Sequence, residues 1–465
     1  MRLLRARGFQ AYFNGGCVRD MLLGREPADY DVSTDATPQE VMRIFPRTLA
    51  VGAQFGVVLV PDKPETTEEH EGEPAQTDSL SSSLPPSLSL ENAVSLGKAV
   101  EVATFRRDLG YSDGRHPDEV RFTKDPREDV QRRDFTVNGM LLDPLADSSA
   151  TDPILDFVGG RADLEAGIVR AIGDPLRRFA EDKLRMLRAV RFAARFEYTI
   201  EPATFAAIQE LAPQIHQVSQ ERVRDELTKM LTEGHARRAF LLLDESGLLR
   251  EVLPEISRMK GVEQPPQFHP EGDVFVHTLL LLEKLPAGSS KTLAWGALLH
   301  DVGKPPTFRV APDRIRFDGH VDVGVKMAAE ICRRLRFSND ETEQILALVD
   351  NHMRFAQVFR MNESTVKKFL RLPRFDEHLE LHRMDVLSSN GILSGYEYAR
   401  ERLQSMPPEA MRPQPLVTGD DLIAAGYEPG PRFKEILGAV EDAQLEGRIE
   451  THDAAMEYLL SKFPL

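Results

Sequence analysis

The pattern of apolar and polar residues changes along the chain. Up to residue 60, short apolar stretches alternate with amphipathic ones, and apolar runs rich in Val, Ile and Phe are typical of strands. The pattern predicts strands at 11–13, 30–33, 55–60 and 99–105 and helices at 18–23 and 37–45. Thr37, Pro38 and Glu40 supply the residue types of a capping box at the start of the second helix.

From residue 161 onwards the spacing of apolar residues is that of helices. Residues 179–196 give the strongest signal, and we expect one amphipathic helix there with a basic opposite face. Further helices are expected at 221–231, 275–285, 291–299, 323–335, 341–350 and 378–387. The chain is therefore predicted to be an α+β protein, with a small mixed sheet near its start and helical domains after it.

Residues 61–98 interrupt the strand pattern with Pro, Ser, Thr and Glu. A stretch of this composition buries too little apolar surface to order itself. We expect a flexible insertion between two strands.

Composition sets wider limits. A length of 465 residues favours about three domains. The two cysteines, Cys17 and Cys332, lack metal-ligand spacing, which indicates a reduced, cytoplasmic protein. We expect neither a membrane span nor a signal peptide. The net charge of −16 argues against a uniformly basic surface, but basic residues gather at 177–195 and at Arg132 and Arg133.

One stretch combines two kinds of chemistry. Gly15 and Gly16 form a turn that opens a helix, where backbone N–H groups and Arg19 would hold phosphate. Asp29 and Asp31 are two positions apart, so on a strand both carboxylates would point to one face and bind Mg²⁺ together with substrate phosphates. Each half alone is also explained by an ordinary turn or an acidic strand end. The combination favours a nucleoside triphosphate held over two metal ions.

The motif GGxVRD followed by DxD resembles the head of the class II nucleotidyltransferases. That family comprises CCA-adding tRNA nucleotidyltransferases and bacterial poly(A) polymerases, within the DNA polymerase beta superfamily. The resemblance implies that Glu101, on a neighbouring strand, adds a third catalytic carboxylate, although an exposed strand glutamate is an equal alternative. It also implies that Arg132, Asp134 and Asn138, within RRDFTVN, contact the triphosphate or ribose.

Asp182 and Arg185 are candidates for reading the base. At i and i+3 of one helix they would be neighbours, and a surface salt bridge is the simpler explanation. A carboxylate accepts hydrogen bonds and a guanidinium donates them, which matches cytosine and adenine and mismatches uracil and guanine. The pair also resembles the EDxxR motif of the same family, whose members are thought to select C and A in this way.

A second set of residues resembles an HD-domain phosphohydrolase. It consists of His277, the adjacent His300 and Asp301, and Asp385 on a later helix. Adjacent residues can bind one metal ion only at an irregular point of the chain, and Gly303 and the proline after Lys304 supply a break. Histidine with carboxylate suits a divalent transition metal, or Mg²⁺ when carboxylates dominate. His320 and His352 are candidate additional ligands or substrate contacts.

The resemblance divides the chain into a nucleotidyltransferase head at 1–145, a helical neck at 146–255, an HD domain at 256–400 and a helical tail at 401–465. It implies an enzyme that adds C, C and A to the 3′ end of tRNA from CTP and ATP with Mg²⁺. A poly(A) polymerase or an A-adding enzyme is the alternative within the family. Two other classes are disfavoured. Intact Asp29 and Asp31 speak against an HD phosphohydrolase whose head only binds, and both ligand sets speak against a non-catalytic RNA-binding module.

Overall fold

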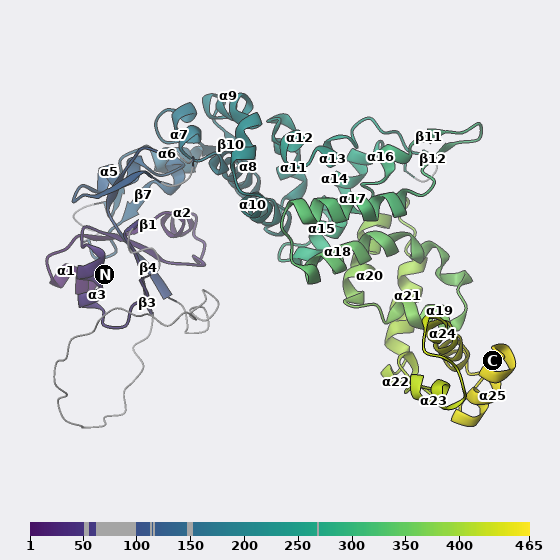
Figure 1. The fold of residues 1–465 in the computed structure, drawn as a ribbon. Helices are drawn as coiled ribbons and strands as arrows, with labels where there is room; N and C mark the ends of the chain where they lie inside the picture. The colour runs from purple at the N-terminus through teal and green to yellow at the C-terminus, as the bar shows by residue number, and fades with distance from the viewer. Residues whose placement is uncertain (51–54, 62–98, 112–113, 115–116, 147–151, 267–268) are drawn as a thin grey trace, which may run out of the picture. The chain divides into compact units, whose positions relative to one another are not determined.

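The computed structural model describes residues 1–50, 55–61, 99–111, 114, 117–146, 152–266 and 269–465. These residues form two compact units, Met1–Val218 and Ser219–Leu465. The large sheet belongs to the first unit, and the second unit is almost entirely helical (Figure 1). The expected insertion at 61–98 lies outside the described residues, apart from Pro61.

The first unit is built on a mixed six-stranded sheet in the order β3-β4-β2-β1-β7-β8. Its strands are β1 (Ala11–Asn14), β2 (Asp31–Thr34), β3 (Val57–Pro61), β4 (Ala99–Thr104), β7 (Met140–Leu142) and β8 (Ile154–Asp156). Strand β2 runs parallel to β4, and the other neighbours are antiparallel. The strands predicted from the apolar pattern are thus confirmed, with shifts of one or two residues at their ends.

Two helices, α1 (Arg2–Ala6) and α3 (Pro38–Ile44), pack on one face of this sheet. The apolar cluster between them consists of Leu4, Ala11, Val32, Ala36, Val41, Val58 and Val102. Because successive side chains of a strand alternate between faces, Asp31 and Ser33 point to the opposite face from Val32. The apolar pattern of the strand therefore places Asp31 on the face that α1 and α3 leave uncovered.

The capping box predicted for α3 is present. The Thr37 backbone N–H donates to Glu40 Oε2 at 2.7 Å, and the Glu40 N–H donates to Thr37 Oγ1 at 3.4 Å. Pro38 occupies the first helical turn, where its missing N–H costs nothing.

The predicted helix at 179–196 is wrong in one respect, because it consists of two helices. Helix α7 (Pro175–Glu181) ends before Asp182, which has an extended backbone, and α8 (Leu184–Phe196) follows Lys183. The Leu184 N–H donates to Asp182 Oδ1 at 3.0 Å, so Asp182 satisfies a free donor at the start of α8.

The remaining elements of the first unit connect the sheet to these helices. They are α2 (Gly16–Leu22), β5 (Arg106–Leu109), β6 (Glu119–Phe122), α5 (Pro126–Gln131), η2 (Thr136–Asn138), α6 (Gly160–Ala166), β9 (Ile168–Val169), β10 (Thr199–Ile200), α9 (Pro202–Leu211) and η3 (Ala212–Gln217). Helix α2 contacts β1, β7 and η2, which places it beside the start of β2.

The second unit surrounds α15 (Lys291–Leu299), which is buried from Thr292 to its end. Its packing partners are α10 (Gln220–Thr232), α14 (Val274–Glu283), α18 (Asn339–Asn351) and α20 (Phe375–Leu387). The other helices are α11 (Ala236–Glu245), α12 (Leu248–Val252), α13 (Pro254–Ser257), α16 (Lys304–Thr307), α17 (His320–Arg334), η4 (His352–Arg360), α19 (Glu363–Leu370), α21 (Ser394–Ser405), α22 (Pro408–Met411), α23 (Gly419–Ala424), α24 (Pro431–Leu445) and α25 (His452–Lys462). A short hairpin, β11 (Arg309–Val310) and β12 (Ile315–Arg316), precedes α17.

The helices predicted in this part of the chain are all confirmed. Within the described ranges, none of the helices combines the length and the apolar character needed to cross a membrane.

Candidate functional site

The acidic site of the first unit forms where β2 and β4 run side by side. Asp31 lies opposite Glu101 in the parallel register, so both carboxylates point to the same face of the sheet. They line a pocket of about 250 Å³, together with Asn14, Phe55, Val57, Ala103, Thr104, Arg106, Arg132 and Arg133. Strand pairing thus joins residues that are far apart in the sequence.

This pocket combines two carboxylates, Asp31 and Glu101, with the guanidinium groups of Arg106, Arg132 and Arg133. Partial burial raises the pKa of Asp31, Arg133 lowers it, and the negative charge of Asp29 raises it again. Glu101 is an exposed residue, yet the surrounding protein and the charge of Asp31 raise its pKa, against the three arginines of the pocket, which lower it. Carboxylates that repel one another in a half-buried pocket match a divalent cation, which removes the repulsion. The donor set of this pocket therefore fits a divalent cation.

Asp29 is placed differently from the prediction. It is exposed and lies in a bend before β2, so it does not share a strand face with Asp31. The expectation of two strand carboxylates is wrong because β2 starts at Asp31, two residues after Asp29. Asp29 is still close enough for its charge to raise the pKa of Asp31.

The predicted phosphate turn lies beside this pocket. Gly15 has φ of 69°, a backbone conformation that favours glycine. A side chain there would also come within 3.4 Å of Arg133 Nη1 and 3.9 Å of Asp31 Oδ2. Gly16 starts α2, as predicted. The glycine at position 15 therefore keeps the approach to the carboxylate open.

Arg19 is not an exposed donor. It is 5% exposed, its Nε and Nη2 donate to Asp20 Oδ1, and its Nη1 donates to Asn138 Oδ1 at 2.8 Å. Its guanidinium also lies 4.4 Å from the centre of the Phe196 ring. Arg19 and Asn138, both predicted to bind nucleotide, thus contact each other and join α2 to η2.

Arg133 is a site residue that the sequence reasoning passed over in favour of Arg132. Its Nη1 donates to Asn14 Oδ1 at 2.6 Å, and its Nη2 donates to Ser33 Oγ at 3.2 Å and to Asp129 Oδ2 at 2.9 Å. Arg132 binds the other oxygen of Asp129. The pair of arginines at 132–133 was the available signal, and only the structure shows which of them lies against Asp31.

Asp134 connects the head to α8. Its Oδ2 accepts from Arg188 Nε at 2.8 Å, and its Oδ1 accepts from the Phe135 N–H and from Asn138 Nδ2. Burial would raise the pKa of Asp134, but Arg188, Arg185 and the Phe135 N–H together outweigh burial and lower it to about 2. Asp134 is thus ionised, and its contact with Arg188 holds α8 against the segment that contains Asp134.

The predicted pairing of Asp182 with Arg185 on one helix is wrong, because Asp182 precedes α8. The guanidinium of Arg185 instead binds Glu181, with Nη1 2.8 Å from Oε2, and its Nη2 donates to the Arg132 carbonyl at 3.2 Å. Arg178 binds the same Glu181 oxygen at 2.7 Å. Glu181 therefore orients Arg185, and Arg185 reaches the backbone of the arginine that lines the acidic pocket.

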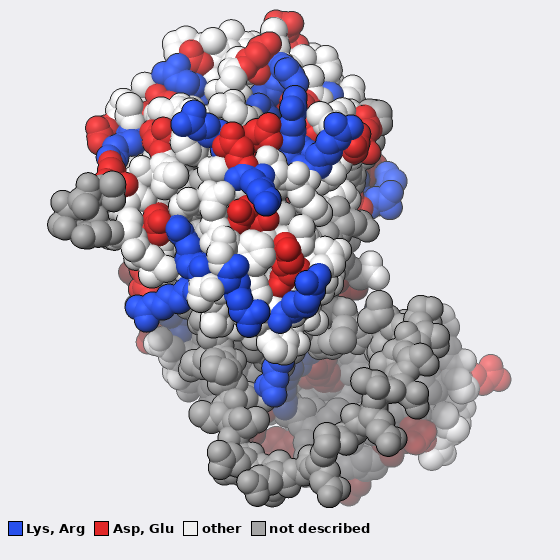
Figure 2. Space-filling model, turned by 90° about the vertical axis from the view of Figure 1, so that its left-hand side faces the viewer, with Lys and Arg blue, Asp and Glu red and all other residues white. Residues whose placement is uncertain are grey.

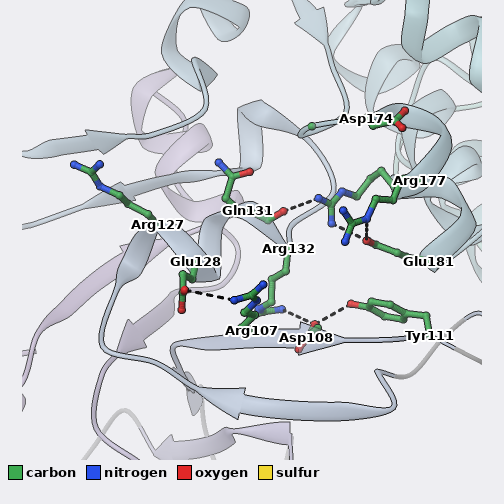
Figure 3. Close-up of a pocket in the computed structure, with 12 residues that line it drawn as sticks. Arg107, Asp108, Tyr111, Arg127, Glu128, Gln131, Arg132, Asp174, Arg177 and Glu181 are labelled. Atoms are coloured by element: carbon green, nitrogen blue, oxygen red, sulfur yellow. Dashed lines mark hydrogen bonds and ion pairs between the residues drawn. The ribbon is translucent and has the colours of Figure 1, made fainter.

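A larger pocket of about 470 Å³ shares Arg132 with the acidic pocket (Figure 3). Its lining residues are Arg107, Asp108, Tyr111, Arg127, Glu128, Gln131, Arg132, Gly173, Asp174, Arg177, Arg178 and Glu181. Tyr111 donates to Asp108 Oδ2 at 2.9 Å, and burial raises the pKa of Tyr111 to about 12, so its hydroxyl stays protonated. Because Arg132 lines both pockets, they adjoin each other.

The basic residues of α7 and α8 are used largely inside the unit. Arg178 and Arg185 bind Glu181, Arg188 binds Asp134, and Arg191 is 6% exposed. On the face drawn in Figure 2, Lys and Arg alternate with Asp and Glu in the upper part, and several Lys and Arg lie close together lower down. The basic stretch of the sequence therefore forms less open basic surface than its composition indicates.

The second unit brings the four predicted HD residues together. His277 Nε2 lies 3.1 Å from Asp385 Oδ1 and 3.3 Å from His300 Nε2. His300 Nε2 lies 3.1 Å from Asp301 Oδ2. Helix α15 ends at Leu299, and His300 and Asp301 occupy the turn before α16, which is the irregular point that the sequence indicated.

His320 and His352 face the other oxygen of Asp301. Their Nε2 atoms lie 3.9 and 3.7 Å from Asp301 Oδ1, and both atoms are buried without a hydrogen-bond partner among the described residues. Lys304 Nζ lies 2.7 Å from Asp301 Oδ2. Unpartnered imidazole nitrogens beside a carboxylate fit a divalent metal ion.

The electrostatics of this cluster differ from those of the first pocket. Burial would raise the pKa of Asp301, but His300 and Lys304 keep it well below its usual value. Burial would lower the pKa of His277, but its hydrogen bonds to Asp385 and Glu271 outweigh burial and raise it to about 9. The cluster lies at one side of a pocket of about 530 Å³ that also contains Arg314, Phe317 and His382.

These features define the class of protein: a nucleotidyltransferase with an α+β head and a helical HD domain. The model of the poly A polymerase head domain matches residues 11–77 and 88–170. A model described as the probable RNA and SrmB-binding site of polymerase A matches 197–260, and the HD domain matches 273–388.

Similar proteins cover nearly the whole chain. The CCA-adding enzyme of Geobacillus sp. (strain WCH70) is 30% identical over 97% of this chain and 93% of its own length. That of Enterococcus faecalis is 30% identical over 99% of this chain and 93% of its own. The crystal structure of the Bacillus stearothermophilus CCA-adding enzyme in complex with CTP has 26% identity and a TM-score of 0.70, and covers 99% of this chain and 96% of that one. The chain therefore belongs to the family of CCA-adding enzymes, and its catalysis is metal-dependent and uses nucleotides.

Proposed function

We propose that this chain adds CMP, CMP and AMP, without a template, from CTP and ATP to the 3′ end of tRNA. The observation that carries the proposal is the pairing of Asp31 with Glu101 across β2 and β4, beside Arg133, in the head of a CCA-adding enzyme. The relative solved with CTP supports the nucleotide. A structure of the same fold, the Thermotoga maritima enzyme complexed with tRNA, supports the RNA partner.

In the reaction, the oxygen of the RNA 3′-hydroxyl forms a bond to the α-phosphorus of the triphosphate. The bond between the α-phosphorus and the bridging oxygen breaks, and pyrophosphate leaves. Two Mg²⁺ ions, when bound, would favour loss of the hydroxyl proton and neutralise the leaving group. Asp31, Glu101 and the nearby Asp29 would hold these ions.

Other residues would hold the triphosphate. The guanidinium groups of Arg132 and Arg133 line the pocket, and the turn at Gly15 and Gly16 lies next to it, with Gly15 beside Arg133 and Asp31. Arg19, Asp134 and Asn138 would act from behind this surface, since their polar groups already bind one another, Asp20 or α8. Their proposed part is to fix the turn and the helix that carry the contacting groups.

We further propose that Asp182 and Arg185 select the base. Glu181 fixes Arg185 through an ion pair of 2.8 Å, so the donors of Arg185 are oriented before a nucleotide enters. An acceptor beside a donor fits cytosine and adenine, and opposes like groups of uracil and guanine.

The central test uses tRNA that lacks its last three nucleotides, with each labelled triphosphate and Mg²⁺. Incorporation of C, C and then A, followed by a stop, supports the proposal. Long A tails, or addition of A alone, would instead identify a poly(A) polymerase or an A-adding enzyme. Asp29→Ala should abolish incorporation, whereas Glu26→Ala, an exposed acid in the same loop, should leave it unchanged.

Base selection has its own test. Asp182→Ala should raise the incorporation of U relative to C and A while the chain still binds tRNA. Glu181→Gln should have a smaller effect in the same direction, because it weakens the orientation of Arg185. Unchanged preference for C and A over U in Asp182→Ala would refute the assignment.

A second activity is favoured by a separate observation, the joining of His277, His300, Asp301 and Asp385 in the second unit. We propose that this HD site binds a divalent transition metal, with His320 and His352 as additional ligands, and hydrolyses phosphate esters of RNA ends or nucleotides, such as 2′,3′-cyclic phosphates or 2′-nucleotides. Hydrolysis should survive Asp29→Ala and be lost in Asp301→Ala. Loss in both variants would contradict two independent sites.

We also propose that the domains end near residues 145, 255 and 400 and that the enzyme is cytoplasmic. Cleavage by a protease at those junctions, with intact fragments between them, would test the boundaries.

A further inference from the structure

One carboxylate contacts the HD cluster from behind. Glu271 lies between α13 and α14, and its Oε1 is 2.7 Å from His277 Nδ1 and 2.9 Å from His269 Nδ1. His277 is fully buried, and the two imidazole rings meet edge to face with centres 4.9 Å apart. A single oxygen of Glu271 therefore contacts two histidines.

These contacts determine where the proton of His277 lies. An ionised carboxylate only accepts hydrogen bonds, so the Nδ1 of His277 must be the donor. Nε2 also faces a carboxylate, with Asp385 Oδ1 at 3.1 Å, so both nitrogens of the metal-free ring can donate. When a metal ion takes the place of the Nε2 proton, the remaining proton stays on Nδ1 and the lone pair is on Nε2. That atom lies 3.3 Å from His300 Nε2 and 3.8 Å from Asp301 Oδ2, on the side of the metal cluster.

We propose that Glu271 is a positioning residue of the HD metal site. It holds the ring of His277 in one orientation and in the tautomer whose Nε2 can bind metal, and its charge makes that nitrogen a stronger donor. The inference rests on the metal-binding role proposed for His277, His300, Asp301 and Asp385. It adds a residue outside that set, from a loop that precedes all four.

The environment of Glu271 argues against a purely structural role. Its Oε2 is buried without a hydrogen-bond partner among the described residues, although a carboxylate that served only to fasten the loop would gain most from using both oxygens. Asp273, two residues later, does fasten the loop. Its oxygens accept from the N–H groups of Val276 at 2.8 Å and Gly261 at 2.6 Å.

Asp273 therefore provides a matched control with the same charge on the same loop. The experiment titrates Co²⁺ into the full chain carrying Asp29→Ala and Asp31→Ala, which removes the carboxylates of the head. Calorimetry gives the affinity, and the visible absorption of Co²⁺ reports its ligands. Glu271→Ala should weaken binding about 10- to 100-fold and change the spectrum. Glu271→Gln, which keeps an acceptor without the charge, should fall between.

Asp273→Ala should lower the unfolding temperature of the metal-free protein and leave the Co²⁺ affinity unchanged. Equal affinities in the Glu271→Ala and Asp273→Ala variants would overturn the proposal and leave the HD metal site standing. If the parent chain binds no Co²⁺, the metal site and the role of Glu271 both fail. If Glu271→Ala does not fold, an unaltered affinity in Glu271→Gln overturns the proposal.

Discussion

In the head, Asp31 and Glu101 lie on adjacent strands, and desolvation by the surrounding protein raises the pKa of both. The charge of Asp29 adds to the rise at Asp31, and the charge of Asp31 adds to the rise at Glu101. In the HD cluster, Asp301 and Asp385 lie among histidines and Lys304, and these neighbours lower both pKa values. In the head, desolvation and the neighbouring carboxylates thus outweigh the arginines of the pocket, whereas in the HD cluster the cationic neighbours outweigh burial. We therefore expect the stability of the fold to depend less on the charges of the first site than on those of the second.

The largest expected effect follows from removing charge in the head. Asp31→Asn should lower the rate of nucleotide addition by about 1,000-fold or more, because loss of a metal-holding carboxylate removes several kcal/mol of stabilisation of the transition state. Its free energy of unfolding should stay the same or rise, since a repulsive charge is gone. Addition assays and urea unfolding measure the two quantities. A large loss of stability in Asp31→Asn would refute the proposed difference between the head and the HD cluster.

For the HD cluster we expect the opposite result, a large loss of stability with little effect on nucleotide addition. Asp301→Ala should lower the free energy of unfolding by about 3–5 kcal/mol, because it leaves the buried Lys304 ammonium without its carboxylate. Nucleotide addition should persist wherever the variant is folded. Urea unfolding without metal tests this, and Asp318→Ala, which removes an exposed pair with Arg309, should change the result by less than about 1 kcal/mol.

Asp134 combines a buried carboxylate with a structural role in the head. Its pKa of about 2 lies below the ordinary 3.8, a difference that corresponds to about 2 kcal/mol. The contribution is present above the unfolded pKa and is lost as the pH falls through the folded pKa. Asp134→Asn should therefore be less stable than the parent by about 2 kcal/mol above pH 5, and the gap should shrink between about pH 4 and pH 2. If the difference in unfolding free energy between the variant and the parent stays constant over this pH range, the ionised carboxylate of Asp134 does not cause that difference.

The smallest expected effects distinguish the two units. Thr37→Ala removes the capping box of α3 in the first unit, and Ser338→Ala removes that of α18 in the second. Each should cost about 1 kcal/mol. In calorimetry, we expect each variant to shift the unfolding transition of its own unit. Equal shifts of a single transition in both variants would show that the units unfold together.

The sequence was most informative where function depends on local spacing. The strands of the head, the capping box at Thr37 and the break after Asp301 follow from residues next to one another, whose propensities act before any tertiary contact forms. The HD residues were found for the same reason, since each of them stands in a short motif.

The predictions from the sequence are wrong where a tertiary contact outweighs a local preference. Asp182 and Arg185 fit one helix by spacing, but Asp182 satisfies the N–H of Leu184, and Glu181 binds Arg185. The basic stretch of α7 and α8 looked like open surface, but Glu181 and Asp134 use several of its arginines internally. An amphipathic pattern shows which face is polar, and it does not show whether another element covers that face.

The sequence by itself determined the α+β class, the order of the elements and the residues that carry charge at both sites. Only the tertiary structure decided that Glu101 lies opposite Asp31, that Arg133 rather than Arg132 lies against it, and that Glu271 lies behind His277. The physical reason is that strand register and helix packing are set by burial of apolar residues distant in the sequence. That packing brings the polar groups next to their partners, and the spacing of the polar residues in the sequence does not determine which partners they meet.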